Sequence, residues 1–412
     1  MTPRPPEPGE PDGGLHRTLG LPLLTLYGLG NILGAGIYVL IGKVAGFAGS
    51  STTLAFLIAM VTAGVTALSY MELSGRYPVS ASVSVYTHRA FGRRWLSTTI
   101  GLAMVFSAIT SAAALAQGFA GYLDTLVPTP GALASLGLLA VLGAIAVKGI
   151  RESAGAAAAL TALEVLGLLL IIWFGRRAFA QADVGALFAI DPAVGFGGLA
   201  AGAFLAFYAY IGFEDMVNVA EEAKRPRRTM PLAILLSLLV STVLYLLVVV
   251  VATTLVSPAE LAGSGAPLSL VFERSGAGNP LLLSSIGMIA AVNGVIVQIV
   301  MGSRILYGMA GQGWISARFA AVHRTFRTPV TATLVVLGAM MLGTVILPLV
   351  SLAQLTSLLV LTIFTLVNAS LVVIKRRGLE HHAHFVVPVA VPYAGVGLCV
   401  CTVLFQLVWG RG

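Results

Sequence analysis

The sequence predicts an all-α, polytopic membrane protein, built as a bundle of apolar helices without a large aqueous domain. Of its 412 residues, 58% are hydrophobic and 10% are charged, whereas soluble domains carry about 25% charged residues. Apolar runs close to the roughly 20 residues that cross the hydrocarbon layer recur along the whole chain. The lipid bilayer is therefore the expected environment of this chain.

Eleven membrane spans are expected from these runs. They cover residues 20–46, 52–75, 95–122, 132–148, 153–174, 198–222, 230–256, 279–310, 330–347, 352–374 and 386–409. Lys and Arg gather in every second connection, as in the loop from Lys224 to Arg228. By the positive-inside rule these connections lie in the cytoplasm. An odd number of spans then predicts a cell-membrane protein with a cytoplasmic N-terminus and a C-terminus outside.

The net charge of +8 is interpreted as this orientation signal and not as a sign of nucleic-acid binding. Residues 1–19, rich in Pro and Gly, are expected to form a disordered cytoplasmic tail. Cys399 and Cys401 lie two residues apart, on different faces of a helix, which argues against a disulfide or a metal pair. No metal or other cofactor is expected.

Glycine interrupts two of the spans. The first span is interrupted at Gly34-Ala35-Gly36, and the sixth at Tyr210-Ile211-Gly212-Phe213. Each glycine costs a helix about 1 kcal/mol relative to alanine. The interruptions lie five spans apart, at corresponding positions of two halves. Such a pair is typical of a transporter with an inverted repeat and a site near the membrane midplane. Close helix packing is the alternative explanation for the glycines of the first span.

The predicted organisation follows from that pairing. After the tail come a first five-span repeat at 20–174, an extracellular linker at 175–197, a second five-span repeat at 198–375, and a loop with the eleventh span at 376–412.

A broken helix exposes backbone donors on one half and acceptors on the other. The N–H groups of Ala35 and Gly36 are expected to form an anion site, and the carbonyls near Ile32, Tyr208 and Ile211 a cation site. Together they fit a zwitterion, which is the main-chain part of an α-amino acid. The breaks therefore predict an amino acid as the ligand.

Three acidic residues accompany these spans. Glu214 lies ten residues before Lys224, or about 15 Å along a helix, so Glu214 and Asp215 are expected near the midplane. Charges there usually face a protein or water-filled interior; a structural, hydrogen-bonded pair is the alternative, and either acid could meet a cationic ligand. Glu72, close to Arg76, is expected to snorkel and to be structural.

The chain resembles the amino acid–polyamine–organocation transporters over nearly its whole length. The resemblance rests on GNILGAGIY (30–38), SYMELSGRYPVSASVSVYTHRAFG (69–92), AYIGFEDMVNVAEEAKRPRRTMP (209–231) and SRILYGMAGQG (303–313). KGIRESAG (148–155) resembles the branch of cationic-amino-acid-transporter-like proteins. The resemblance implies a LeuT-like fold of five plus five spans with broken spans one and six, here followed by one extra C-terminal helix where most members have two.

The resemblance also implies roles for single residues. Ala35 and Gly36 would offer amides to the substrate carboxylate, with Gly34 permitting the break. The carbonyls of Ile32, Tyr208 and Ile211 would meet the ammonium, the ring of Tyr208 would close over the substrate, and Gly212 belongs to the same site.

Protons are the expected coupling ion. Residues 286–301 contain no Ser or Thr to ligate sodium. Glu164 stands where the resembling branch carries a lysine, thirteen residues from Arg151 and twelve from Arg176. Because burial disfavours the charged form of a carboxyl, Glu164 is expected to be neutral at rest and to release its proton on opening. A structural, hydrogen-bonded Glu164 and a helix register that turns it away are the alternatives, and Glu214 is the second candidate for the proton.

The sequence thus predicts a secondary-active amino acid transporter working by alternating access, by proton-coupled symport or exchange. Small apolar residues favour neutral substrates, with Phe204, Phe207 and Asn293 as candidate pocket residues. A transporter of polyamines or other organic cations, or a membrane sensor that does not move its ligand, are the alternatives. An enzyme is disfavoured because all six histidines fall in predicted tails or loops and no catalytic constellation emerges.

Overall fold

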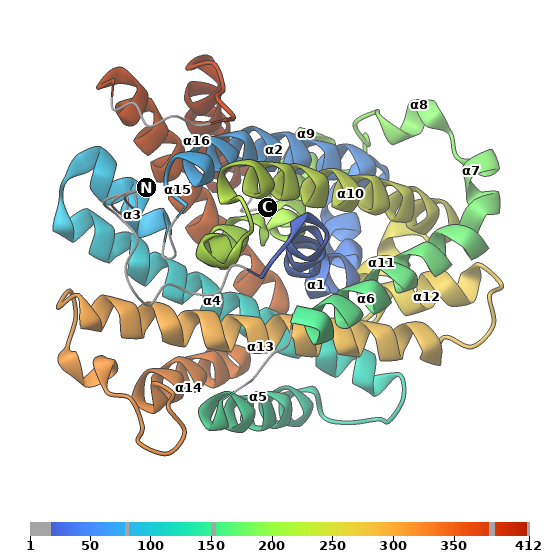
Figure 1. Cartoon of the computed structure of the whole chain (residues 1–412). Helices are drawn as coiled ribbons and strands as arrows, with labels where there is room; N and C mark the ends of the chain where they lie inside the picture. Colours follow the sequence, from blue (N-terminus) through green and yellow to red (C-terminus); the bar gives the residue numbers. More distant parts are fainter. Residues whose placement is uncertain (1–17, 79–81, 150–153, 379–383, 410–412) are drawn as a thin grey trace, which may run out of the picture.

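The computed structural model describes residues 18–78, 82–149, 154–378 and 384–409, and it is all-helical there (Figure 1). Within those ranges the β structure is one isolated bridge, between Leu19 and Ala223. The predicted all-α class is confirmed. The tail predicted at 1–19 lies outside the described residues except for its last two, and Arg151 and Gly412 also lie outside them.

Every predicted span contains a helix. In chain order these are α1 (Leu21–Ala48), α2 (Thr52–Arg76), α4 (Arg94–Asp124), α5 (Gly131–Lys148), α6 (Ala154–Phe174), α9 (Gly195–Phe207), α10 (Pro226–Leu255), α13 (Leu281–Gly311), α14 (Val330–Ile346), α15 (Leu349–Arg376) and α16 (Ala390–Trp409). Among the described residues, nine stretches are long and apolar enough to cross a membrane; the first, Leu21–Arg76, holds both α1 and α2, and α14 is a shorter apolar helix. The chain is therefore a polytopic helical bundle.

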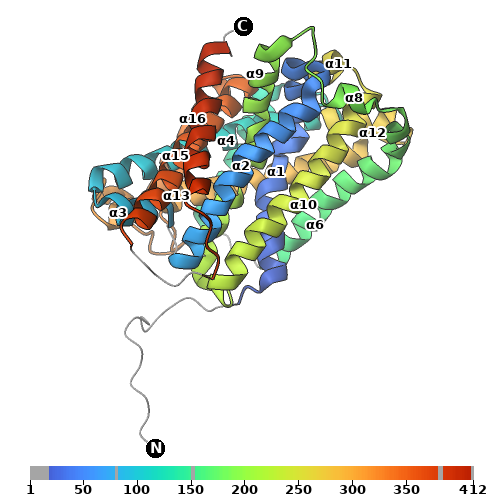
Figure 2. The ribbon, with the colours of Figure 1, turned by 90° about the horizontal axis from the view of Figure 1, so that it is seen from above.

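The bundle is organised around α1 (Figure 1). This helix packs against α6, α9 and α10, while α4 packs along α13 and α15. At one edge α5 and α14 lie side by side, and at the opposite edge α16 covers α15 and α2. Figure 2 shows that α1 begins at one end of the bundle and α16 ends at the other.

Short helices fill the connections between the spans, where the sequence predicts loops. They are η1 (Gly49–Ser51), α3 (Ser82–Phe91), η2 (Gly175–Arg177), α7 (Ala178–Gln181), α8 (Val184–Leu187), α11 (Pro258–Gly263), α12 (Pro267–Arg274) and η5 (Ala317–Ala320). At the start of α11, Ser257 Oγ accepts from the Glu260 N–H while the Glu260 carboxylate accepts from the Ser257 N–H, which is a capping box. Both α11 and α12 pack against α1.

Asp191 anchors the predicted linker, residues 175–197, to the turn that precedes α2. Its carboxylate accepts hydrogen bonds from the backbone N–H groups of Ser50, at 2.8 Å, and Ala193, at 2.9 Å. These two groups, Ser50 first, stabilise the charged form and hold the pKa of Asp191 below its ordinary 3.8. In return, the Asp191 N–H donates to Ser51 Oγ.

Glu72 does not snorkel to the membrane surface as the sequence predicts. Its side chain is fully buried and forms ion pairs with Arg76 Nη2 at 2.6 Å and with Lys375 Nζ at 2.8 Å. The Val387 N–H donates to the second carboxylate oxygen. A buried charge needs such partners because removing it from water is costly. Its role remains structural: the cluster joins α2, α15 and the segment that leads into α16.

Candidate functional site

The first break lies at Gly34. There the backbone leaves the helical conformation, with φ 15° and ψ −157°, and α1 resumes afterwards. A side chain at Gly34 would meet no atom within 4 Å, whereas a Cβ at Gly36 would lie 3.1 Å from Ala209 Cα. Ala35 stands between the two glycines, and its side chain is outside the described part of the structure. The break thus brings Gly36 against the sixth span.

The second break lies at Ile211-Gly212. α9 continues as the 3₁₀ turn η3 (Tyr208–Tyr210), Ile211 is extended, and the 3₁₀ helix η4 (Phe213–Glu222) follows. Gly212 has φ 130°, a conformation open to glycine and strained for other residues. A Cβ there would collide with the backbone of Asn31 and lie 2.9 Å from Ile32 N. The two breaks are therefore in direct backbone contact.

Several backbone groups exposed by the breaks have partners within the protein. Tyr245, on α10, donates its hydroxyl to the Ile32 carbonyl at 2.7 Å and lies 3.0 Å from the Ala209 carbonyl. The Tyr208 carbonyl accepts from the Ile211 N–H. A carbonyl has two lone pairs, so Ile32 and Tyr208 can each accept a further hydrogen bond. Tyr245 could not be predicted as a site residue, because a tyrosine in an apolar span gives no sign of its hydrogen-bond partner.

A small central cavity lies at the breaks. Its volume is about 40 Å³, and it is lined by Gly30, Asn31, Ile32, Gly34, Gly36, Ser111, Leu115, Tyr208, Ile211, Asp215, Asn293, Gly294, Val297 and Gln298. The structure thus brings Ile32, Gly34, Gly36, Tyr208 and Ile211 together around one space. Gly212 supports the wall from behind through its contact with Asn31. Such a volume holds a few water molecules at most.

The cavity is also lined by polar side chains, besides the backbone positions predicted to bind the substrate. Of the earlier candidates, Asn293 lines the cavity, whereas Phe204 and Phe207 are buried outside its lining. Ser111 Oγ lies 2.9 Å from the Tyr208 hydroxyl, linking α4 to the sixth span.

Two amides of the lining have an unpaired atom. Asn31 Nδ2 and Gln298 Oε1 are buried without a hydrogen-bond partner in the described ranges. In the sequence both residues stand out as isolated amides in apolar spans, but the sequence does not show which way their side chains face and so does not place them in the site.

Glu164 lies beside the cavity, behind Asn293. It is completely buried, and its Oε1 accepts from Asn293 Nδ2 at 2.9 Å. Its Oε2 has no hydrogen-bond partner among the described residues. The Tyr38 hydroxyl donates to the backbone carbonyl of Glu164. The side chain therefore points from α6 toward α13, into the bundle.

The two acids of the sixth span have different surroundings. Glu214 Oε2 accepts from the Gly212 N–H at 2.8 Å, so it satisfies a donor freed by the break. Asp215 lines the central cavity instead. Both are nearly buried, with exposures of 6% and 5%.

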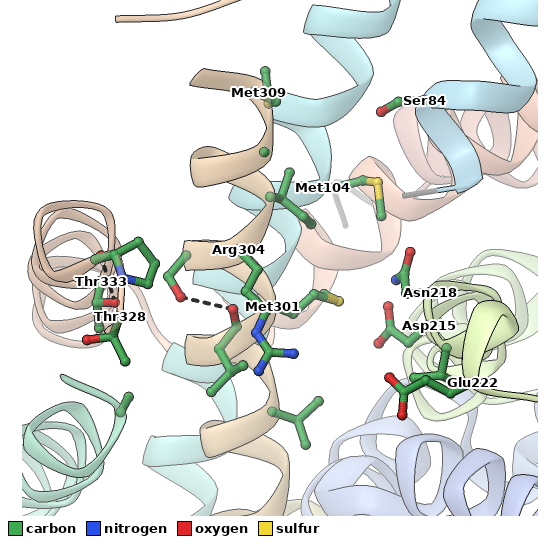
Figure 3. Close-up of a pocket in the computed structure, with 18 of the residues that line it drawn as sticks. Ser84, Met104, Asp215, Asn218, Glu222, Met301, Arg304, Met309, Thr328 and Thr333 are labelled. Carbon is green, nitrogen blue, oxygen red and sulfur yellow. Dashed lines mark hydrogen bonds between the residues drawn. The ribbon is translucent and has the colours of Figure 1, made fainter. Parts of the chain in front are cut away.

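A wide vestibule reaches the cavity from one end of the bundle. Its volume is about 1840 Å³, and it shares Asp215 and Val297 with the central cavity. Its outer part is lined by residues of the basic loops, among them Arg94, Lys148 and Arg327. Figure 3 shows Asp215, Asn218 and Glu222 on one wall, facing Arg304 of α13 on the other.

Comparison with known proteins matches residues 19–411 to the amino acid permease family. The branched-chain amino acid permease of Bacillus subtilis is 30% identical, over 95% of this chain and 88% of that protein. The methylthioribose transporter of the same organism is 28% identical, over 94% and 87%. Mouse cationic amino acid transporter 4 is 32% identical over 90% of this chain, which spans only 62% of that longer protein.

Proposed function

The chain belongs to the amino acid permease family, and from that premise we propose that it is a secondary-active amino acid transporter that works by alternating access. The family and the transporters among its relatives identify a membrane transport protein and not an enzyme. One observation carries the proposal: the broken first and sixth spans touch, through Gly212 against Asn31 and Gly36 against Ala209, and a cavity lies at the contact.

We propose a LeuT-like inverted repeat as the architecture. The first repeat is 20–174 and the second 198–375, with the linker at 175–197 outside and the eleventh span after 376. The position of the two breaks, at Gly34 and Gly212, supports this pairing because each falls in the first span of its half.

The cell membrane is the proposed location, with the N-terminus in the cytoplasm and the C-terminus outside. The basic loops support this orientation, as do the opposite ends at which α1 begins and α16 ends (Figure 2). In this orientation the vestibule opens to the cytoplasm, and the structure corresponds to an inward-open state.

The substrate's main chain is proposed to bind at the breaks. Its carboxylate takes the N–H groups of Ala35 and Gly36, at the start of the second half of α1. Its ammonium takes carbonyls among Ile32, Tyr208 and Ile211, and the Tyr208 ring covers it. The placement of Gly34, Gly36 and these three residues around one cavity supports the assignment. Since that cavity holds only about 40 Å³, the site has to widen toward the vestibule to admit an amino acid.

Glu164 is the proposed proton carrier. No cation accompanies it among the contacts of the described residues, and a lone charge in a membrane interior is costly. Asn293 donates to Glu164 and also lines the cavity. A substrate bound in the cavity can therefore influence the protonation of Glu164 through Asn293. Glu214, which already accepts from the Gly212 N–H, is the second candidate.

Counterflow in proteoliposomes tests the proposal. Purified protein is reconstituted with a high internal concentration of one amino acid, and entry of the same radiolabelled compound is followed for each of the twenty standard amino acids. Transient accumulation of at least one is expected. Binding without counterflow would identify a sensor. Counterflow with polyamines alone would favour the second candidate function, organic-cation transport, for which the buried carboxylate of Asp215 is the supporting observation.

A further inference from the structure

Two side-chain amides in the lining of the central cavity lack a partner within the protein. Asn31 Nδ2 and Gln298 Oε1 are buried and form no hydrogen bond with any described residue. Other polar side chains of the same lining do have partners. Ser111 Oγ lies 2.9 Å from the Tyr208 hydroxyl, and Asn293 Nδ2 donates to a buried carboxylate. Because a buried polar group without a hydrogen bond is unfavourable, the two amides are arranged to meet a group that the protein itself does not supply.

The two amides lie at the end of the cavity that faces the vestibule. Tyr27 lines the vestibule, and Asn31, four residues further along α1 and so on the same helix face, lines the cavity. On α13, Gln298 follows Val297, which lines both spaces. The helices α1 and α13 pack against each other. A substrate whose main chain is bound at the breaks therefore extends its side chain along these amides toward the vestibule.

The unpaired atoms are one donor and one acceptor, and few substrate groups satisfy both. A cationic group offers only donors, a carboxylate only acceptors, and an apolar side chain neither. A hydroxyl offers both on a single atom, whereas a carboxamide offers them on separate atoms, which matches partners on two different helices.

Asp215 does not change this assignment to a carboxamide. It is the charged residue among the described lining of the cavity, and it also borders the vestibule. There its carboxylate is outnumbered by basic residues, because two acidic residues, Asp215 and Glu222, share the described lining with five basic ones, Arg89, Arg94, Lys148, Arg304 and Arg327. The carboxylate of Asp215 therefore does not require a cationic substrate.

We propose that Asn31 and Gln298 are specificity-determining residues that bind a carboxamide in the side chain of the substrate. Asn31 Nδ2 donates to the carboxamide oxygen, and Gln298 Oε1 accepts from the carboxamide nitrogen. The substrates are then asparagine and glutamine. This inference rests on the proposed transport function and on the widening of the cavity that any amino acid requires.

Isosteric amino acids test the inference. Leucine matches asparagine in shape without the amide, and homoleucine likewise matches glutamine. In competition binding to the purified full-length protein, the wild type is expected to prefer the amide member of each pair. Asn31→Leu and Gln298→Met each replace an amide by an apolar side chain of similar size. Each should lower the asparagine-over-leucine preference by about 5- to 30-fold, because one polar group of the ligand is left buried and unpaired. Leucine affinity should stay the same or rise, which also shows that the variants are folded.

Asn218→Leu is the matched control. Asn218 lines the vestibule but not the central cavity, and it lies on the wall opposite Arg304 (Figure 3). In so wide a space water can pair with an amide of the ligand, so the preference should change by no more than about twofold.

Three results would overturn the inference. They are a wild type that binds leucine or lysine as tightly as asparagine, an unchanged preference in either Asn31→Leu or Gln298→Met, and an equal loss of asparagine and leucine in variants that keep the wild-type melting temperature. The last result would place the amides at the main chain of the substrate. Unlike these, failure of every amino acid to bind the wild type would refute the proposed function itself.

Discussion

Substituting Glu164 by glutamine removes the proposed proton carrier while keeping its contacts. The glutamine side chain retains an oxygen to accept from Asn293 Nδ2, as Glu164 Oε1 does at 2.9 Å. The new amide nitrogen takes the place of Oε2, which has no hydrogen-bond partner in the described part of the chain. Folding and substrate affinity should therefore change little, with affinity within about threefold of wild type, because no existing hydrogen bond is lost.

The effect on coupling should be much larger. If one proton moves with each substrate molecule, a gradient of one pH unit supplies about 1.4 kcal/mol and sustains about tenfold accumulation. The Glu164→Gln variant cannot titrate at this position. It should equilibrate substrate across the membrane without accumulating it, so the ratio of inside to outside concentration falls from about ten to about one.

The assay is uptake into proteoliposomes with an acidic exterior, using a substrate found by counterflow. Accumulation should rise with the imposed pH difference for wild type and stay flat for Glu164→Gln, while counterflow persists in both. Glu214→Gln serves as the matched control and should still accumulate. Wild-type accumulation with the wild-type pH profile in Glu164→Gln would refute the reasoning, make Glu164 structural and turn attention to Glu214.

Three further predictions concern the breaks, the linker and the topology. Gly212→Ala should abolish substrate binding and lower the melting temperature, because its Cβ meets the backbone of the first span. The control Gly378→Ala is also at positive φ but in open space, so it should carry only the backbone strain of about 1–2 kcal/mol. Equal effects of the two substitutions would argue against the contact between Gly212 and the first span. The pKa of Asp191 lies below 3.8, so its anchoring should hold above pH 3.8 and fail as the pH falls further. Hydrogen-exchange protection across 184–194, taken relative to the intrinsic exchange rate at each pH, should fall on acidification and, at neutral pH, in Asp191→Asn. Unchanged protection in that variant would remove the anchoring role. A cysteine added after Gly412, in a chain without native cysteines, should be labelled from outside intact cells; labelling that needs permeabilised cells would overturn the eleven-span topology.

The spans could be predicted because hydrocarbon thickness and loop charge act on long stretches of chain. The helix of the second span, Thr52–Arg76, agrees with the expected 52–75 almost residue for residue. The breaks were also predictable, since glycines at Gly34 and Gly212 are unfavourable in a helix unless the backbone must depart from it. Both properties are local and need no knowledge of neighbouring helices.

The polar partners of the site could not be predicted in the same way. Tyr245 bonds to Ile32 across 213 residues of sequence, and Glu72 pairs with Lys375 as well as with its neighbour Arg76. Such pairs depend on how spans rotate against one another, and periodicity in strongly apolar helices does not fix that rotation. The short helix α11 was not predicted even though its capping box at Ser257 is a local signal in the sequence. The helix α12 has no side-chain cap at its start and gives no such signal.

The claim that the backbone of the first break is itself the ligand is tested most directly by substrate binding to Gly36→Val. A valine side chain at Gly36 would press on the sixth span, because the Cα of Ala209 lies 3.1 Å from the position of a Cβ at Gly36. Gly137→Val, in α5 where a Cβ meets no atom within 4 Å, controls for valine in a membrane helix. We expect Gly36→Val to yield monodisperse protein that binds no amino acid, with Gly137→Val binding normally. Wild-type affinity in a well-folded Gly36→Val protein would contradict the account.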